Sequence, residues 1–374
     1  MSAMVQTAGT QMATDLDGAL AEIAAGAAER DGSRRPDFPI VPFTLLGAAG
    51  ALRSNAVPGA DRPPAAPELA LVRRVAAADG SVGRIFDGHV NAVERVAVQA
   101  PERVRDDELR AVAAGHRLAG VWGGDPVGGE GPPAAVVADG SAEVLRGVKT
   151  FCSGAGGLQR ALILARDDGG GGASGAGGPP VLVWIDLTDA RRVQVDTDWY
   201  RSRGLVASVS HRVVFHDAPV MARFGPPGAI AQQPWFGRDA LRTAASWAGM
   251  ADTAVAGALG ALRERPSCGE LEGLAVGRIL TAQRTIDVWI GAAAAAMDAA
   301  APDLADVALH ARAAIAGACR TILDEAARAC GSRPFVRGDA LDRARRDLEV
   351  FLLQHRLDPM LARAGGAALA EGRS

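Results

Sequence analysis

The segment LRGVKTFCSGA at residues 145–155, followed by the apolar run ALILA at residues 161–165, decides the fold of this chain. The run is one of five short stretches rich in β-branched and aliphatic residues, and glycine, aspartate and proline separate these stretches. They lie at residues 134–137, 161–165, 181–185, 193–195 and 212–215. We expect them to form a small antiparallel β-domain.

Helical patterns flank this β-rich region on both sides. Apolar residues recur there every three or four positions, which is the period of an amphipathic helix. The helices expected in the first third lie at residues 16–25, 43–52, 68–78 and 82–98. Four longer ones follow Pro234, with prolines between them, at residues 238–263, 271–299, 303–330 and 339–364. Four helices of that length indicate a bundle.

The pattern therefore predicts an α+β fold with three domains. Residues 1–117 would form an N-terminal α-helical domain, residues 118–228 the central antiparallel β-domain, and residues 229–374 a C-terminal four-helix bundle. This order differs from the alternating order of a dinucleotide-binding sheet, and no GxGxxG sequence follows a predicted strand. A nucleotide cofactor would have to bind through another fold.

The composition excludes several classes of protein. With 374 residues, of which 48% are hydrophobic, the chain can bury a sizeable core. Its 40 basic and 43 acidic residues give a net charge of -3, which argues against nucleic acid as a partner. The N-terminus lacks a signal-peptide pattern, and Asp298 interrupts the longest apolar stretch, so we expect a cytoplasmic protein without a membrane span. Neither the cysteines nor the histidines have a metal-ligand spacing, and no metal site is predicted.

Three segments together resemble the acyl-CoA dehydrogenase family. Residues 145–155 resemble the family's hairpin L-x-G-x-K-x-(aromatic)-x-(Ser/Thr)-(Gly/Asn), and GLVASVSHRVVFHDAPV at residues 204–220 resembles its G-M-R-x-(Ser/Thr)-x-(Ser/Thr) pair of strands. LDRARRDL at residues 341–348 resembles its R-x-x-R-D helix. The order and spacing of the three segments agree with an acyl-CoA dehydrogenase-like fold over nearly the whole chain.

The resemblance implies a flavoprotein, with FAD as the usual cofactor and FMN as the other option. The flavin ring would lie between the β-domain and the C-terminal helices of a homotetramer or homodimer. Ser153 matches the family hydroxyl at the flavin N5 edge, Phe151 the aromatic residue over the ring, and Ser208 and Ser210 its paired hydroxyls. The alternatives are a serine in a turn, a phenylalanine in the core and ordinary strand hydroxyls.

Arg265 stands where the family has R-x-x-F-G, an arginine that reaches the FAD pyrophosphate of a neighbouring subunit. Cys268 replaces the aromatic residue of that motif, and Val276 replaces a downstream glutamine. The loop WGGDP at residues 122–126 keeps only the Gly/Asp character of the family's flavin loop. FAD is thus inferred from architecture more than from intact ligands, and a solvated arginine remains the alternative for Arg265.

The general base is the open question. Removing an α-proton from an acyl thioester requires a positioned base, which in the family is a glutamate. One family position for it falls on His355, nine residues after Arg346, and the other falls on Ala240. An imidazole can act as a base, or it can donate a hydrogen bond to a flavin C4a-peroxide, as in the monooxygenases that share this fold. The alternative is a histidine on a helix surface at a subunit contact.

These residues favour an FAD-dependent oxidoreductase that oxidises a small molecule at flavin N5, an acyl thioester by family default, and passes electrons to an electron-transfer flavoprotein. His355 would be its acid-base group. A second hypothesis is a monooxygenase that receives reduced flavin from a flavin reductase and uses His355 to stabilise the peroxyflavin. A third is a non-catalytic relative that keeps the bundle as a binding module.

Overall fold

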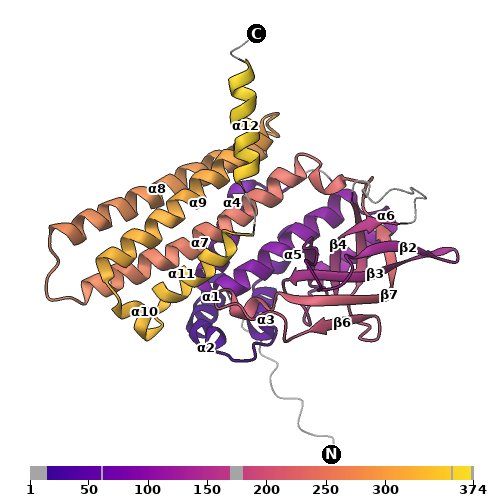
Figure 1. Cartoon of the computed structure of the whole chain (residues 1–374), viewed down its shortest axis with the longest axis horizontal. Coiled ribbons are helices and arrows are strands. Elements are labelled where there is room, and N and C mark those ends of the chain that lie inside the picture. The colour runs from indigo at the N-terminus through magenta and orange to yellow at the C-terminus, as the bar shows by residue number, and fades with distance from the viewer. Residues whose placement is uncertain (1–14, 60–61, 169–179, 355–356, 372–374) are drawn as a thin grey trace, which may run out of the picture.

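The computed structural model describes residues 15–59, 62–168, 180–354 and 357–371, and begins with a group of helices (Figure 1). Asp15 caps the first helix by accepting a hydrogen bond from the Gly18 N–H, and Asp79 caps the longest helix of this N-terminal group in the same way. The helices are α1 (Leu16–Ala25), α2 (Ala27–Asp31), α3 (Ile40–Ala48), α4 (Ala65–Ala78), α5 (Gly80–Gln99) and α6 (Glu102–Ala113), with a 3-10 turn η1 (Ala51–Arg53).

A seven-stranded sheet follows and closes on itself. Its strands are β1 (Ala119–Trp122), β2 (Ala135–Asp139), β3 (Ala142–Cys152), β4 (Arg160–Asp167), β5 (Val181–Asp186), β6 (Val193–Asp196) and β7 (His211–Arg223). The order β4-β2-β3-β7-β5 returns to β4 through the β4–β5 pair, so these five strands form a barrel, to which β1 and β6 add at the sides. Most pairs are antiparallel, as predicted, while β1–β4 and β2–β4 are parallel.

The C-terminal region is the predicted helical bundle, and the α+β fold class is confirmed. Its helices are α7 (Trp235–Arg263), α8 (Glu270–Asp298), α9 (Leu304–Cys330), the short α10 (Arg333–Arg337), α11 (Ala340–Phe351) and α12 (Asp358–Glu371). No helix in the described ranges is both long and apolar enough to cross a membrane. The domain boundaries at 117/118 and 228/229 remain a prediction.

One predicted helix is wrong. The pattern predicts a single helix over residues 339–364, but α11 ends at Phe351 and α12 begins at Asp358. Pro359 has no N–H to bond the carbonyl group four residues earlier, so an uninterrupted helix is disfavoured there. Figure 1 shows α12 leaving the bundle, and none of its described side chains is buried.

Helix α5 lies at the centre of the molecule and is buried around its whole circumference from Gly80 to Ala97. It packs against α4, α7, α6 and β1, and Figure 1 shows it between the bundle and the sheet. A helix buried on all sides is usually apolar. This one carries a polar stripe, and each buried polar group of that stripe needs a partner. The stripe consists of Arg84, Asp87, Asn91, Glu94 and Arg95.

Candidate functional site

The structure brings three of the predicted hydroxyl groups together at one end of the barrel. Ser153 follows β3, Ser208 ends the 3-10 turn η2 (Val206–Ser208), and Ser210 precedes β7. The antiparallel pairing of β3 with β7 places these segments side by side. Ser210 Oγ lies 2.9 Å from Ser153 Oγ and 2.8 Å from Ser208 Oγ, and all three side chains are buried. The three hydroxyls therefore form a continuous hydrogen-bonded chain, which we call the serine chain.

The backbone beside the serine chain is strained. Phe151, Leu205 and Val209 have φ values of 54°, 53° and 42°. The left-handed region is costly for residues other than glycine, above all for a β-branched one such as Val209. Such strain persists where the surrounding structure holds it, and it concentrates at functional sites.

Phe151 is not a core residue. Its side chain is 58% exposed, and its ring meets the Trp199 ring edge-on with centroids 4.9 Å apart. An exposed aromatic ring two residues from the buried Ser153 hydroxyl is available to cover a ligand. Its predicted place over a flavin ring stays a prediction.

Aromatic side chains and amide groups enclose the serine chain. The Trp122 indole N–H donates to the Ser153 carbonyl at 3.0 Å, and the Gly154 N–H donates to the Ser208 carbonyl at 2.8 Å. The Tyr200 hydroxyl donates to the Gly204 carbonyl at 3.1 Å, and burial raises its pKa. These neutral donors thus fix the backbone around the serine chain.

Two buried histidines lie near this end of the barrel, and both are neutral. Burial lowers the pKa of His89 to about 4, and its ring is fully used: Nε2 donates to the Leu52 carbonyl, and Nδ1 accepts from the Ala119 N–H. Burial also lowers the pKa of His211, whose Nδ1 has no hydrogen-bond partner in the structure. His89 is therefore a packing residue, while His211 keeps an unused ring nitrogen beside Tyr200.

Arg346 and Asp347 hold the serine chain in place from α11. Arg346 forms a bidentate ion pair with Asp31 of α2 and another pair with Asp342. Asp347 is buried, and its Oδ1 accepts the Leu205 N–H at 2.5 Å. Burial raises the pKa of Asp347 to about 7. The motif that resembles R-x-x-R-D therefore acts structurally, by tying α11 to α2 and to η2.

The loop at residues 122–126 is fixed by the only lysine of the sequence. Lys149 of β3 is buried, and its ammonium group pairs with the Asp125 carboxylate at 2.7 Å. The Thr150 N–H and hydroxyl bond the Gly124 and Asp125 carbonyl groups. A charged side chain in the middle of a buried strand is a signal that could have pointed to this pair.

A second feature that sequence reasoning misses is a buried ion cluster between α4, α5 and α7. Arg242 donates to Glu68, Glu94 and Asn91, and its pKa is raised because these carboxylates outweigh burial. Asp239, next to the aligned family position Ala240, accepts two hydrogen bonds from Arg95. Burial raises the pKa of Asp239 to about 6, against the effect of Arg95.

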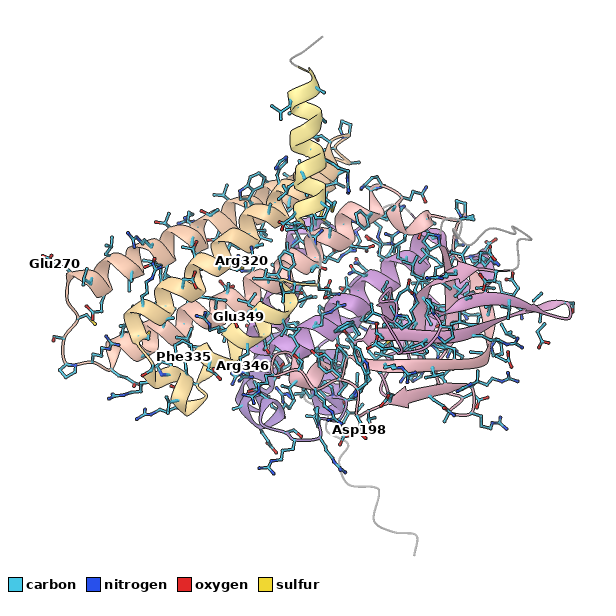
Figure 2. All side chains as sticks on the ribbon, viewed as in Figure 1. Asp198, Glu270, Arg320, Phe335, Arg346 and Glu349 are labelled. Atoms are coloured by element: carbon cyan, nitrogen blue, oxygen red, sulfur yellow. The ribbon has the colours of Figure 1, made fainter. Side chains whose placement is uncertain are left out.

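Arg265 lies apart from the serine chain. Arg265 lies in the loop between α7 and α8, and Figure 2 shows the neighbouring Glu270 at the end of the bundle away from the sheet. The Arg265 guanidinium donates to the Cys330 carbonyl and to Glu272. His355 lies outside the described residues, so its place in the site is still a prediction.

The donor set at the serine chain fits a flavin ring edge. The three hydroxyls share two mutual hydrogen bonds, and Ser208 also hydrogen-bonds the Tyr200 side chain, while the hydroxyl oxygens keep acceptor capacity for a ligand N–H. The pyrophosphate half of FAD finds no comparable support, because Arg265 is engaged within its own chain. In the described part of the chain, no cluster of His, Cys, Asp and Glu suits a metal ion.

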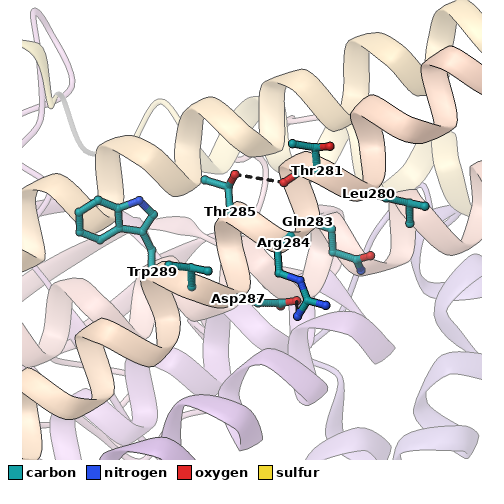
Figure 3. A pocket seen from close by; sticks show the side chains of 8 residues that line it. Leu280, Thr281, Gln283, Arg284, Thr285, Asp287 and Trp289 are labelled. Carbon is teal, nitrogen blue, oxygen red and sulfur yellow. Dashed lines mark hydrogen bonds and ion pairs between the residues drawn. The ribbon is translucent and has the colours of Figure 1, made fainter.

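A hollow on the outer face of α8 is separate from this site (Figure 3). All of its lining residues come from this one helix, among them Arg284, Asp287 and Trp289. It is a surface groove without a second wall, and it brings no predicted site residue together.

Comparison with solved structures shows that the chain has the acyl-CoA dehydrogenase fold. KijD3 in complex with FMN and dTDP-3-amino-2,3,6-trideoxy-4-keto-3-methyl-D-glucose matches with a TM-score of 0.77 and 23% identity, over 94% of this chain and 92% of that chain. Methanesulfinate monooxygenase MsuC from Pseudomonas fluorescens matches with a TM-score of 0.76 and 22% identity, over 94% of this chain and 95% of that chain. FMN-bound TdsC from Paenibacillus sp. A11-2 matches with a TM-score of 0.75 and 18% identity, over 94% of this chain and 96% of that chain.

No protein-family model matches the sequence, and no curated protein matches it. At these identities the likeness to solved structures establishes the fold alone. The predicted resemblance in fold is confirmed, and the chemistry has to be argued from the site.

Proposed function

We propose that this protein is a flavin-dependent monooxygenase that binds reduced FMN and oxygenates a small molecule. The observation that carries the proposal is the Ser153–Ser210–Ser208 chain, buried at the barrel end beside α5. It combines hydroxyl donors suited to a flavin edge with a fold in which KijD3 and TdsC bind FMN. FMN is favoured over FAD because Arg265, at the family's pyrophosphate position, already donates to Glu272 and to the Cys330 carbonyl.

The positions of the family base argue against acyl-thioester dehydrogenation. Ala240 has no acidic group, and the adjacent Asp239 is occupied by Arg95. The other position carries His355, an imidazole where a dehydrogenase needs a carboxylate. The charged stripe of α5 also makes a poor channel for an acyl chain. This favours the monooxygenase over the dehydrogenase with its electron-transfer flavoprotein.

Reduced flavin, when bound, would supply the two electrons for dioxygen chemistry, and a separate flavin reductase is the partner we propose as its source. The residues of this chain have three tasks. The serine chain orients the ring edge, and Phe151 covers the ring. His355 would hold a proton at an imidazole nitrogen and would be the proton donor to the bound flavin. The burial of α5 excludes water from the reacting centre.

A flavin titration and a product analysis test the proposal. FMN should bind the purified protein, and Ser210→Ala should weaken binding, whereas Ser332→Ala, at an exposed serine before α10, should not. The loaded protein, reduced without oxygen and then mixed with oxygen and a panel of small sulfur, nitrogen and aromatic compounds, should give a product heavier by one oxygen atom. Reduction of bound flavin by acyl-CoA would favour the dehydrogenase, and absence of flavin binding would favour the non-catalytic relative.

A further inference from the structure

Arg312 of α9 is a buried arginine whose binding edge is unused. The residue is 2% exposed, and its Nε and Nη2 have no hydrogen-bond partner. These two nitrogens form one edge of the planar guanidinium, the edge that grips both oxygens of an oxyacid. A buried cation without acceptors is unfavourable unless a ligand supplies them.

The same chain shows what that edge does when a partner is present. Arg73 of α4 donates from Nε and Nη2 to the two carboxylate oxygens of Asp252, at 2.6 and 2.8 Å. The buried Arg242 is likewise supplied with Glu68 and Glu94. The fold thus provides carboxylates for its other buried arginines, and Arg312 stands out because its edge receives none.

The surroundings of Arg312 carry an excess of positive charge. Arg84 of α5 is also buried, and it donates a single hydrogen bond, of 3.3 Å, to Asp87. Asp87 is the carboxylate that acts on both guanidiniums, and it also accepts from Asn91 and Thr243. Burial lowers the pKa of Arg312 to about 10, so it is still protonated at neutral pH. Arg84 and Arg312 therefore share Asp87, a carboxyl whose own pKa is raised by burial.

Aromatic rings and unused donors complete the surroundings. The guanidinium of Arg312 lies over the Trp247 ring at 5.5 Å, that of Arg84 over the Phe351 ring at 5.2 Å, and the two rings meet edge to face. The Trp247 indole N–H and the adjacent Ser246 hydroxyl are buried without partners. A β-carbon added to the buried Gly88 would meet nothing within 4 Å, which shows open space on α5 one turn from Arg84.

We infer that Arg312 is the anchor of a binding site for a small oxyacid anion, a carboxylate, sulfinate or sulfonate, enclosed by α5, α7, α9 and α11. The free guanidinium edge takes two oxygens, and Trp247 and Phe351 pack against the body of the molecule. The charge of the anion balances the second guanidinium. The inference rests on the proposed function only in calling this anion the substrate, since binding itself requires no flavin.

The site also adjoins the serine chain. Tyr200, which lies beside Ser208, acts on the pKa of Arg84, and η2 packs against α5. An anion held at Arg312 would place the rest of its molecule along α5 toward the hydroxyls that we assign to the flavin. The charge of the substrate would thus set its orientation.

Binding of matched anions and neutral amides to the whole chain tests the inference. The probes are acetate, benzoate and methanesulfonate against acetamide, benzamide and methanesulfonamide, measured by calorimetry without flavin and at constant ionic strength. At least one anion should bind ten times more tightly than its amide. Arg312→Gln should abolish that preference. The control variant Arg345→Gln removes a guanidinium that lies over Phe335, elsewhere on the bundle (Figure 2), and it should keep the preference.

Stability measurements separate binding from a structural role. Without any ligand, Arg312→Gln should not lower the melting temperature, because it removes an unpaired buried charge. Should this variant fail to fold, Arg312→Lys keeps the charge but loses the two-pronged edge, and it should still lose the preference. Equal binding of anions and amides, or a preference retained by both variants, would overturn the inference. FMN binding, measured in the same preparations, tests the proposed function independently of anion binding.

Discussion

Arg242→Met should be among the most destabilising substitutions in this chain. The side chain is fully buried and donates to Glu68, Glu94 and Asn91, while methionine keeps the volume of the stem and removes the charge. Removing one partner from a buried ion pair costs about 3–5 kcal/mol, because the other charge stays buried.

The pKa of Glu94 gives a second, independent magnitude. Burial raises this pKa, but Arg242, Arg238 and Arg62 outweigh burial and lower it from 4.5 to about 2. At about 1.4 kcal/mol for each tenfold change in acidity, this corresponds to about 3 kcal/mol of stability. Since the folded pKa is the lower one, this stability is present above pH 4.5 and is lost as the pH falls toward 2.

Urea unfolding at several pH values measures both effects. At pH 7 the midpoint for Arg242→Met should fall at an unchanged slope, and less stability should be lost on acidification than in the wild type. Arg110→Met removes a surface pair with Asp107 and should cost below about 1 kcal/mol. The reasoning would be refuted by an Arg242→Met protein as stable as the wild type, or by an unaltered pH dependence.

Three further substitutions probe the site. Ser210→Ala removes the hydroxyl that joins Ser153 to Ser208 and should weaken FMN binding about five- to tenfold, the equivalent of one hydrogen bond, as read from flavin fluorescence. The wild type should lose stability as the pH rises from about 4 to 7, because burial raises the pKa of the Asp347 carboxyl to about 7 and the folded state favours its protonated form. Asp347→Asn should remove this loss. Thermal melts across that pH range check the prediction. His355→Ala should abolish turnover and leave the circular dichroism spectrum unchanged, and full activity would remove this residue from the mechanism.

Local patterns predict the parts of this fold that local forces determine. The helical period and the proline boundary together place the start of α7 within three residues of its observed position. The motifs at residues 145–155 and 204–220 are enough to bring Ser153, Ser208 and Ser210 together, because adjacent strands of one sheet carry them. Barrel closure through β4–β5 depends on contacts between distant segments, which no local period records.

The sequence does not show which polar residues are buried, and this limits how much of the site can be predicted from it. The polar stripe of α5 has the spacing of a solvated helix face, yet α4 and α7 pack against this helix. Arg312 falls within a regular helical pattern and resembles any surface arginine of this arginine-rich chain. Only the three-dimensional packing distinguishes an arginine that has found a carboxylate, such as Arg242, from one that has not.

The two halves of the polar stripe of α5 differ in how completely their charges are paired. Toward its C-terminus, Glu94 and Arg95 are matched by Arg238, Arg242 and Asp239 of α7, and this half is closed by the protein itself. Toward its N-terminus, Arg84 and Asp87 face a further cation instead of a further anion, beside the strained segment that carries Ser208. An ion network that holds a fold together would be completed along its whole length. The N-terminal half lacks this balance and lies beside strained backbone and the unpartnered donors of Ser246 and Trp247, which is better explained by a ligand that completes the network.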